Sequence, residues 1–176
     1  SEFNKPLNQL YKITIFVNLN GLVKKGTDGK LTFTGVSLPE GKKPLILSQD
    51  DVSYYEYMDN SGFPSKLIVD KQNQIKNIYI TIRRKTVGDY DMVPLIDSFI
   101  KKHPRFFLSS AKGTLALTGY NGVLGYPTSK SEYGDNEKQT KNQAAKKVAD
   151  QLKKDGWSFA SHTWGHLNMT QASLAD

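Results

Sequence analysis

The stretch from residue 144 to residue 161 constrains the fold of this chain most strongly. Its first part places apolar residues along one face of a helix and lysines on the other faces. Gly156 is positioned to end that helix, and the apolar run Trp157–Ser161 (WSFAS) follows at once. We therefore expect a helix followed by a buried strand, as in α/β folds. The apolar positions of the helix are Ala144, Ala145, Val148, Ala149 and Leu152.

The elements before this stretch follow the same alternation. We expect an apolar strand over residues 44–47, a helix that begins after Asp89 or Asp91, and a second strand over residues 115–118. Pro94 suits the first turn of the helix, and Pro104 ends it. The order strand, helix, strand, helix, strand is typical of a parallel sheet with helical crossovers. In such sheets and barrels, functional side chains collect at the carboxyl ends of the strands.

Three segments interrupt this order. Residues 65–69 and 75–82 alternate apolar and polar residues around a polar turn, which predicts a β-hairpin. A glycine-rich loop, residues 119–128, follows the second strand, and the polar stretch 129–142 indicates an exposed insertion. We interpret the tip of the hairpin and the loop region as insertions into an α/β unit.

The first 41 residues are expected to form a small β-rich extension that precedes the α/β unit. The β-branched run at residues 11–19 predicts a strand. Asp28 and Gly29, followed by alternating residues 31–36, predict a hairpin or a paired edge strand. A break at residues 39–43 then separates this extension from the next strand. We therefore divide the chain into residues 1–41 and residues 42–176.

Composition narrows the possible chemistry. The 176 residues are 38% hydrophobic and 11% aromatic, which fits a globular protein. The absence of cysteine excludes disulfides and thiolate metal sites, so any metal must be held by nitrogen or oxygen ligands. A net charge of +7 favours anionic partners or simply solubility. The lysines are scattered without a recognition motif, which argues against nucleic acid. No apolar run approaches the roughly 20 residues of a membrane span.

The polar residues at two of the expected strand ends suggest a metal centre. Residues 45–51 (LILSQDD) end in two adjacent carboxylates, and residues 161–166 (SHTWGH) hold two histidines four positions apart. On a helical turn, His162 and His166 would have Cβ atoms about 5–6 Å apart and could reach one ion. Asp51 would complete a set of two histidines and one carboxylate with open positions. Such a metal lowers the pKa of its water towards about 7, and Asp50 is placed to act as general base in attack on an ester or amide carbonyl.

Less specific interpretations of these motifs stay open. Two histidines at this spacing are common by chance, and paired aspartates at a strand end often cap a following helix. The zinc-protease signature HExxH is not met, because Thr163 stands where its glutamate would be. His103, beside Pro104, is expected to be a surface or capping histidine. Tyr54, Tyr120 and Asn121 lie near expected strand ends and are candidates for substrate contact, with packing and turn roles as the alternative.

The two motifs resemble those of a known family. LSQDDVSYY followed by WSFASHTWGH is similar to the first two motifs of the polysaccharide deacetylase family with the NodB homology domain, a carbohydrate esterase family 4-like group. Family members commonly have TFDDG in the first motif and H-[ST]-x-x-H in the second. The resemblance covers residues 42 to about 176, and the second motif with its preceding helix is the most specific part. Val52 replaces the usual glycine of the first motif, and Gln49 replaces the phenylalanine.

The resemblance implies a fold and an activity. The fold would be a partial or distorted (β/α) barrel of the deacetylase type. The activity would be metal-dependent hydrolysis of N-acetyl groups on wall polysaccharide or peptidoglycan, a reaction at carbon-nitrogen bonds other than peptide bonds, by a protein secreted from or attached to a bacterial cell. It implies Asp50 as catalytic base, Thr163 as a loop-stabilising residue, and a divalent metal, usually zinc, held by Asp51, His162 and His166.

The later motifs of the family do not occur in this sequence. Family members continue past the second motif with an R-x-P segment, an aspartate and tryptophan motif, and a late L-x-H histidine that acts as general acid. This chain ends at Asp176, before any of the three. We therefore expect a fragment that carries the metal-binding half of the domain and is inactive or nearly so by itself. The alternative is a non-catalytic module of the same fold that binds anionic wall polysaccharide.

Overall fold

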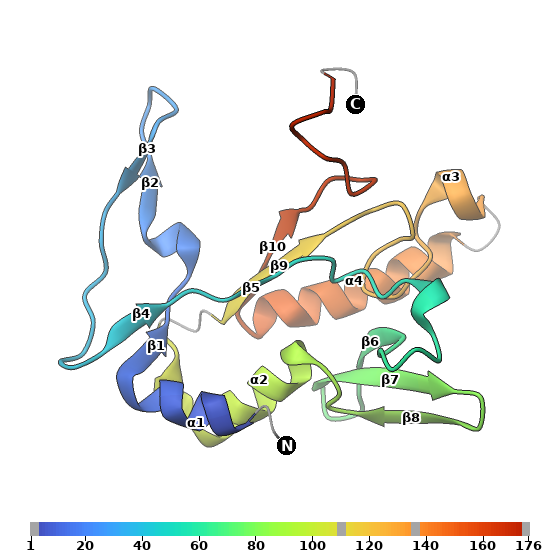
Figure 1. Cartoon of the computed structure of the whole chain (residues 1–176), viewed down its shortest axis with the longest axis horizontal. Coiled ribbons are helices and arrows are strands. Elements are labelled where there is room, and N and C mark those ends of the chain that lie inside the picture. Colours follow the sequence, from blue (N-terminus) through green and yellow to red (C-terminus); the bar gives the residue numbers. More distant parts are fainter. Residues whose placement is uncertain (1–3, 109–111, 135–137, 174–176) are drawn as a thin grey trace.

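A three-stranded parallel sheet lies at the centre of the computed structural model, which describes residues 4–108, 112–134 and 138–173. Its strands are β5 (Ser48–Gln49), β9 (Gly113–Leu117) and β10 (Trp157–Ser161), in the order β10-β9-β5 (Figure 1). The parallel arrangement confirms the expected alternation, because the chain passes through a helix between successive strands. The first strand was expected over residues 44–47, but residues 43–45 pair with residues 14–16 in a separate sheet, and β5 takes its place in the central sheet. All three strands point their carboxyl ends towards the same edge of the sheet.

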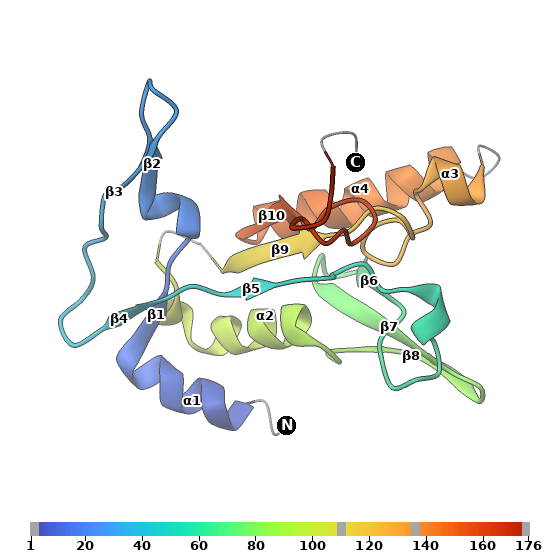
Figure 2. The ribbon, with the colours of Figure 1, turned by 45° about the horizontal axis from the view of Figure 1, so that its top comes forward.

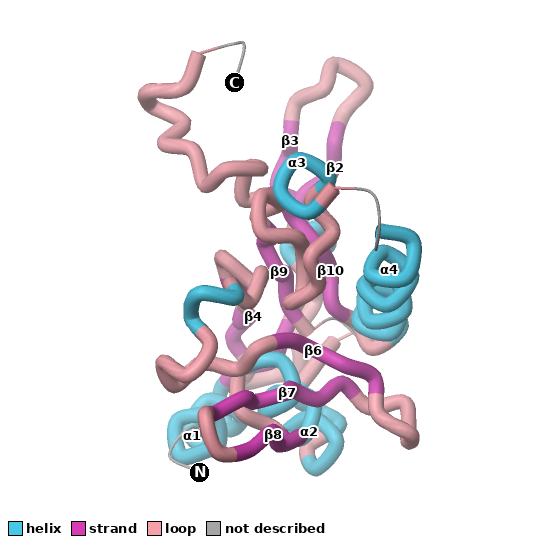
Figure 3. The backbone as a smooth tube through the Cα atoms, turned by 90° about the vertical axis from the view of Figure 1, so that its right-hand side faces the viewer, coloured by secondary structure: helices cyan, strands magenta, loops and turns pink. Residues whose placement is uncertain are grey.

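Two long helices form the crossovers. α2 (Met92–Lys102) begins after Asp91, as expected, and buries Val93, Ile96, Phe99 and Ile100. α4 (Lys138–Lys154) buries Ala145, Val148 and Leu152 and packs beside β10 (Figure 3). After its last turn, Gly156 adopts a φ of 98°, the left-handed conformation that glycine allows at low cost. Both helices contribute to one core cluster that also contains Leu115 of β9.

The insertion expected at residues 129–142 is partly helical. It contains the short helix α3 (Lys130–Tyr133), and α4 already begins at Lys138. Residues 135–137, which belong to the same predicted insertion, lie outside the described residues. The helix α4 therefore begins earlier in the sequence than its apolar pattern alone indicates. No helix in the described part of the chain is both long enough and apolar enough to cross a membrane.

The expected hairpin at residues 65–82 is confirmed and has a third strand. β6 (Lys66–Val69), β7 (Ile75–Thr81) and β8 (Arg84–Gly88) form an antiparallel sheet in that order. Ile82, at the turn between β7 and β8, is exposed, but Leu67 and Ile75 are buried in the main core. The inner face of this sheet is therefore an integral wall of the core, and α2 packs against β7.

The N-terminal region differs from the prediction. Residues 11–13 belong to the helix α1 (Asn4–Ile13), and only β1 (Thr14–Phe16) is extended. The strand predicted over residues 11–19 is confirmed only at residues 14–16. It was wrong for residues 11–13, because Leu7, Leu10 and Tyr11, spaced three and four apart, pack on the core from one helical face. α1 lies against α2 (Figure 2), where the ring of Tyr11 contacts that of Phe99 at a centroid distance of 6.4 Å.

The remaining N-terminal elements agree with the predicted hairpin. β2 (Val23–Lys25) and β3 (Leu31–Phe33) pair antiparallel. β1 pairs in parallel with β4 (Lys43–Leu45), which lies beyond the proposed division at residue 41. Short 3-10 helices are η1 (Leu19–Gly21), η2 (Glu56–Met58) and η3 (Pro104–Phe106). The described strands thus form four small sheets of two or three strands, and a barrel of the deacetylase type stays a prediction.

Candidate metal centre

Three side chains predicted to hold a metal come together beyond the carboxyl ends of β5 and β10. Nε2 of His166 lies 3.2 Å from Oδ2 of Asp51, and Nε2 of His162 lies 3.9 Å from Oδ1 of the same carboxylate. The two imidazole rings are 4.9 Å apart between centroids, at an angle of 66°. Asp51, His162 and His166 each offer one ligand atom within 4.8 Å of the others. The three residues therefore form a cluster that could hold a metal ion.

The local backbone that presents these ligands is unusual. Asp51, Thr163 and His166 have φ values of 56°, 63° and 56°, in the left-handed region that non-glycine residues rarely adopt. For Thr163 this is a particular departure, because its side chain is β-branched. Strained backbone of this kind persists where surrounding contacts impose it, and it is concentrated at functional sites.

The spacing of the two histidines had predicted a helical turn, but the structure does not place them on one. The segment after β10 is an irregular loop that contains the left-handed residues Thr163 and His166. Oγ1 of Thr163 accepts a hydrogen bond of 2.7 Å from the backbone N–H of Leu167, and the N–H of Thr163 donates to Oγ of Ser161 at 3.2 Å. These side-chain bonds close the loop and bring the two imidazoles together without helical geometry.

The end of β9 holds the two ligand-bearing loops against each other. On one side, the N–H of Val52 donates to the carbonyl of Ala116 at 3.2 Å. On the other side, the N–H of His162 donates to the carbonyl of Leu117 at 2.8 Å. The strand between the two loops therefore sets the relative position of Asp51 and the histidines.

A buried chain of hydroxyl groups supports the carboxylate of Asp51. Oη of Tyr55 donates to Oδ1 of Asp51 at 3.0 Å and lies 2.7 Å from Oγ1 of Thr118. Oγ1 of Thr118 in turn lies 2.6 Å from Oγ of Ser53. An ionised carboxylate can only accept hydrogen bonds. Tyr55 therefore donates to Asp51, Thr118 donates to Tyr55, and Ser53 donates to Thr118. Tyrosine is protonated at neutral pH, and burial raises the pKa of Tyr55 further.

Sequence reasoning missed this hydroxyl chain. Tyr55 lies in the aromatic segment that follows the two aspartates, so its position near Asp51 carried a weak signal. Ser53 and Thr118 carried none, because a serine or threonine near a strand end is ordinary. Their role arises only from the contact between the loop after β5 and the end of β9.

The other predicted site residues are distributed around the cluster. Asp50, the predicted base, is exposed and has no side-chain hydrogen bond or ion pair with any described residue. The ring of Tyr120 stacks on that of Tyr55 at a centroid distance of 5.2 Å. Asn121 and Tyr54 line a neighbouring cavity of ≈ 230 Å³.

Tyr54 is directed into the protein rather than towards Asp51. Its hydroxyl donates to Oδ2 of Asp91, which also accepts a bond of 2.9 Å from Nδ2 of Asn77. Burial raises the pKa of Asp91, and the bonds from Tyr54 and Asn77 oppose that rise. The phenol of Tyr54 therefore links the loop after β5 to the start of α2.

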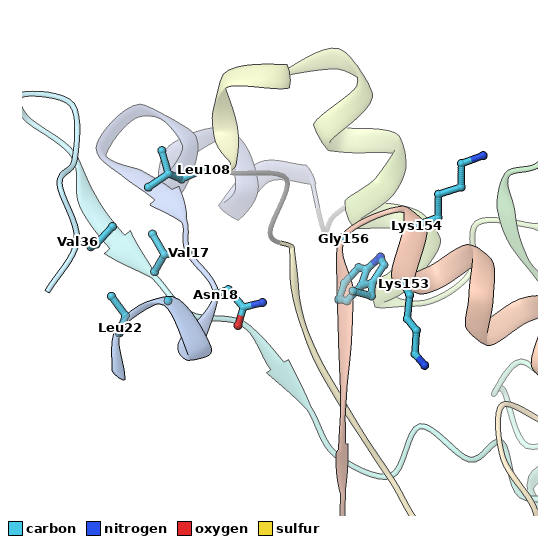
Figure 4. Close-up of a pocket in the computed structure, with 10 residues that line it drawn as sticks. Val17, Asn18, Leu22, Val36, Leu108, Lys153, Lys154 and Gly156 are labelled. Carbon is cyan, nitrogen blue, oxygen red and sulfur yellow. The ribbon is translucent and has the colours of Figure 1, made fainter. Parts of the chain in front are cut away.

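Two other features of the described residues lie away from the cluster. His103 packs against Tyr11 and Phe99 at centroid distances of 4.6 and 4.4 Å, at the end of α2. A cavity of ≈ 450 Å³ lies beside Trp157, at the amino end of β10. Figure 4 draws the residues that line it. Val17, Leu22, Val36 and Leu108 form its apolar side, and the side chains of Lys153 and Lys154 extend away from that group.

Comparison with known proteins leaves the site to be interpreted from its own geometry. No protein-family model, no curated protein and no solved structure matches the chain.

Proposed function

We propose that this chain carries the metal-binding half of a polysaccharide deacetylase, a hydrolase that removes acetyl groups from N-acetylated sugars of wall polysaccharide or peptidoglycan. The observation that carries the proposal is the meeting of Asp51, His162 and His166 within 4.8 Å of one another. The resemblance of the DD and HTWGH motifs to that family gives the cluster its chemical interpretation. The same resemblance supports a bacterial protein that acts outside the cytoplasm.

The donor atoms suit a divalent cation such as Zn²⁺. Two neutral imidazole nitrogens and one carboxylate oxygen are a common ligand set for zinc and leave coordination positions open. When bound, the ion supplies Lewis acidity at the carbonyl oxygen of an acetamide group. Asp51 and the histidines would hold it, and the hydroxyl of Tyr55 would keep the carboxylate in the binding orientation.

Asp50 is proposed to act as the general base. It is exposed next to Asp51, and none of its carboxylate oxygens is engaged by another described residue. It can therefore accept the proton of a water molecule that attacks the acetamide carbon. Collapse of the tetrahedral species then breaks the carbon-nitrogen bond, and the amine needs a proton from a separate donor. His103 packs against Tyr11 and Phe99 at the end of α2, outside the cluster, and is not proposed as that donor.

Zinc binding is the primary test because it does not depend on that donor. We expect the protein to bind one equivalent of Zn²⁺ in elemental analysis after gel filtration, and His162→Ala to lose it. His103→Ala is the matched control, since it removes a histidine that lies outside the cluster. Asp50→Asn should keep the zinc and abolish any acetate release from N-acetylglucosamine oligomers. Unchanged zinc stoichiometry in His162→Ala would refute the proposed metal centre.

A second candidate function is binding without turnover. Exposed lysines of α4, including Lys146, Lys147 and Lys153, add to the net charge of +7. Such a surface suits an anionic wall polymer. Polymer binding that weakens steeply with salt, together with no acetate release from any protein containing this chain, would select that alternative.

A further inference from the structure

An exposed tryptophan is held in a fixed position next to the metal cluster. Trp164 lies between His162 and His166 in the sequence, and 58% of its surface is exposed. Its carbonyl accepts bonds from the N–H groups of Gly119 and Tyr120 at 3.0 and 2.9 Å. A single exposed aromatic residue is unremarkable by itself. Because these two hydrogen bonds hold the backbone of Trp164, its ring is positioned beside the metal cluster.

Gly119 provides the space in which the indole lies. A Cβ atom at Gly119 would be only 2.6 Å from Cδ1 of Trp164, so any larger residue would displace the ring. The edge of the indole also contacts Tyr120, with ring centroids 6.3 Å apart at 69°. Tyr120 stacks in turn on Tyr55, which bonds Asp51. The position of the indole is therefore tied to that of the carboxylate ligand.

A groove of ≈ 680 Å³ runs beside the indole. This volume lies within the range of about 300–1,000 Å³ that is usual for small-molecule sites. Trp164 and Gly119 line one part of it, and the hydroxyl-bearing residues Thr128, Ser129 and Ser131 line another. Oγ of Ser129 and Oγ of Ser131 are 3.1 Å apart. Val123 and Lys130 complete the lining. The groove therefore combines an apolar aromatic face with several hydroxyl groups and one amine.

This combination matches the surface of a sugar ring. A pyranose presents C–H groups on its faces and hydroxyl groups around its edge. The C–H groups carry a small positive charge and are attracted to the negative face of an indole. The edge hydroxyls can exchange hydrogen bonds with serine and threonine.

We propose that the groove beside Trp164 binds the pyranose ring adjacent to the sugar whose acetamide reaches Asp51, His162 and His166. The inference rests on the proposed function, because the metal cluster defines which sugar reacts. It adds that the ligand is a chain of at least two sugars. A single N-acetylglucosamine can occupy one position only, so a tetramer of N-acetylglucosamine should bind more tightly.

The two tryptophans of the chain allow a direct measurement. Trp157 is 2% exposed and Trp164 is 58% exposed, so acrylamide will quench mainly the fluorescence of Trp164. We expect the tetramer to protect Trp164 from acrylamide, in the zinc-loaded and in the zinc-free protein. The monosaccharide should need a concentration about two- to tenfold higher, because it lacks the second ring that contacts the indole.

Matched glycine variants test the position of the indole. Gly119→Ala keeps Trp164 but displaces its ring, whereas Gly165→Ala adds a methyl group whose nearest neighbour, Cδ2 of Leu167, is 3.9 Å away. By calorimetry, Gly119→Ala should weaken tetramer binding about tenfold and Gly165→Ala should not change it. The variant Ser131→Ala, which removes one of the lining hydroxyl groups, should weaken binding severalfold without altering zinc stoichiometry.

The outcomes separate this inference from the proposed function. Zinc binding that depends on His162, combined with tetramer binding that leaves Trp164 fully quenchable, would overturn the groove and keep the metal centre. Equal affinities for tetramer and monosaccharide, no tetramer binding, or wild-type affinity in Gly119→Ala would also overturn it. Protection of Trp164 without any zinc binding would support the groove and remove the deacetylase proposal.

Discussion

The carboxylate of Asp51 accepts a hydrogen bond from Tyr55 through Oδ1, at 3.0 Å, while its Oδ2 lies 3.2 Å from Nε2 of His166. The two oxygens of one ligand are thus used differently. Oδ1 is held by the phenol of Tyr55 and also lies 3.9 Å from Nε2 of His162, whereas Oδ2 lies next to His166 alone. A carboxylate that is oriented in this way loses less freedom when an ion binds, because the protein has already restricted its rotation.

Loss of the Tyr55 hydroxyl should weaken metal binding. In Tyr55→Phe, Asp51 loses its hydrogen bond while the ring stack with Tyr120 is kept. We expect zinc affinity to fall about 10- to 100-fold, the usual effect of removing a group that orients a metal ligand. Titration of the zinc-free protein against a competing chelator measures this change.

Tyr126→Phe is the matched control for that variant. Tyr126 and Tyr55 are each 8% exposed, and the hydroxyl of Tyr126 donates to the carbonyl of Leu67 at 3.0 Å, away from the cluster. Both variants should lose about 1 kcal/mol of unfolding free energy, the net value of a buried hydrogen bond. Equal zinc affinities in the two would contradict a positioning role for Tyr55.

The hydroxyl of Thr163 should matter for the shape of the histidine loop. Thr163→Val removes the acceptor for the N–H of Leu167 and leaves the left-handed backbone unsupported. We expect zinc affinity to fall severalfold and global stability by no more than about 1 kcal/mol. Thr81→Val, which removes the hydroxyl that bonds the carbonyl of Arg84 in the β7–β8 turn, is the control. Zinc affinity that is equally unaffected in both variants would refute the expectation.

The ion pair between Lys112 and Asp97 should stabilise the protein through its burial. Nζ of Lys112 lies 2.6 Å from Oδ1 of Asp97, which also accepts a bond of 3.0 Å from the indole N–H of Trp157. Only 11% and 17% of the two side chains are exposed. Lys112→Met leaves a buried carboxylate without its cation, so we expect a loss of about 3–5 kcal/mol in urea unfolding.

Lys146→Met tests whether burial is the cause. Nζ of Lys146 lies 2.5 Å from Oδ2 of Asp150, but both side chains are largely exposed. Its removal should change stability by no more than about 0.5 kcal/mol. Adding Asp97→Asn to Lys112→Met should restore part of the lost stability. Similar losses of unfolding free energy in Lys112→Met and Lys146→Met would show that burial does not determine how much an ion pair stabilises this protein.

Asp91 should make stability depend on pH in the acidic range. Burial raises its pKa in the folded state, so the folded protein binds this proton more tightly than the unfolded chain. The resulting stabilisation is complete below the unfolded pKa of about 3.9 and is lost as the pH rises through the folded pKa. The unfolding free energy of wild type should therefore fall relative to Asp91→Asn between about pH 4 and neutrality. Parallel urea-unfolding curves over this range would contradict the prediction.

Most of the secondary structure between residues 44 and 161 could be predicted because its signals are local. The apolar stripe of α4, the glycine after it and the run Trp157–Ser161 each depend on neighbours a few residues away. β8 was missed, because an edge strand that begins with Arg84 and Lys85 lacks an apolar alternation. The end of α1 was misassigned as a strand, because the β-branched run that follows it favours an extended conformation and the helix has few apolar residues of its own.

The candidate ligands could also be found from sequence, since residues at the carboxyl ends of parallel strands meet at one edge. The sequence by itself therefore determined that Asp51, His162 and His166 belong together. Only the tertiary structure decided how they are held. Three features depend on contacts between distant segments, which no local period or propensity encodes. They are the left-handed loop at Thr163, the hydroxyl chain from Ser53 to Tyr55, and the packing of Trp164 against Gly119.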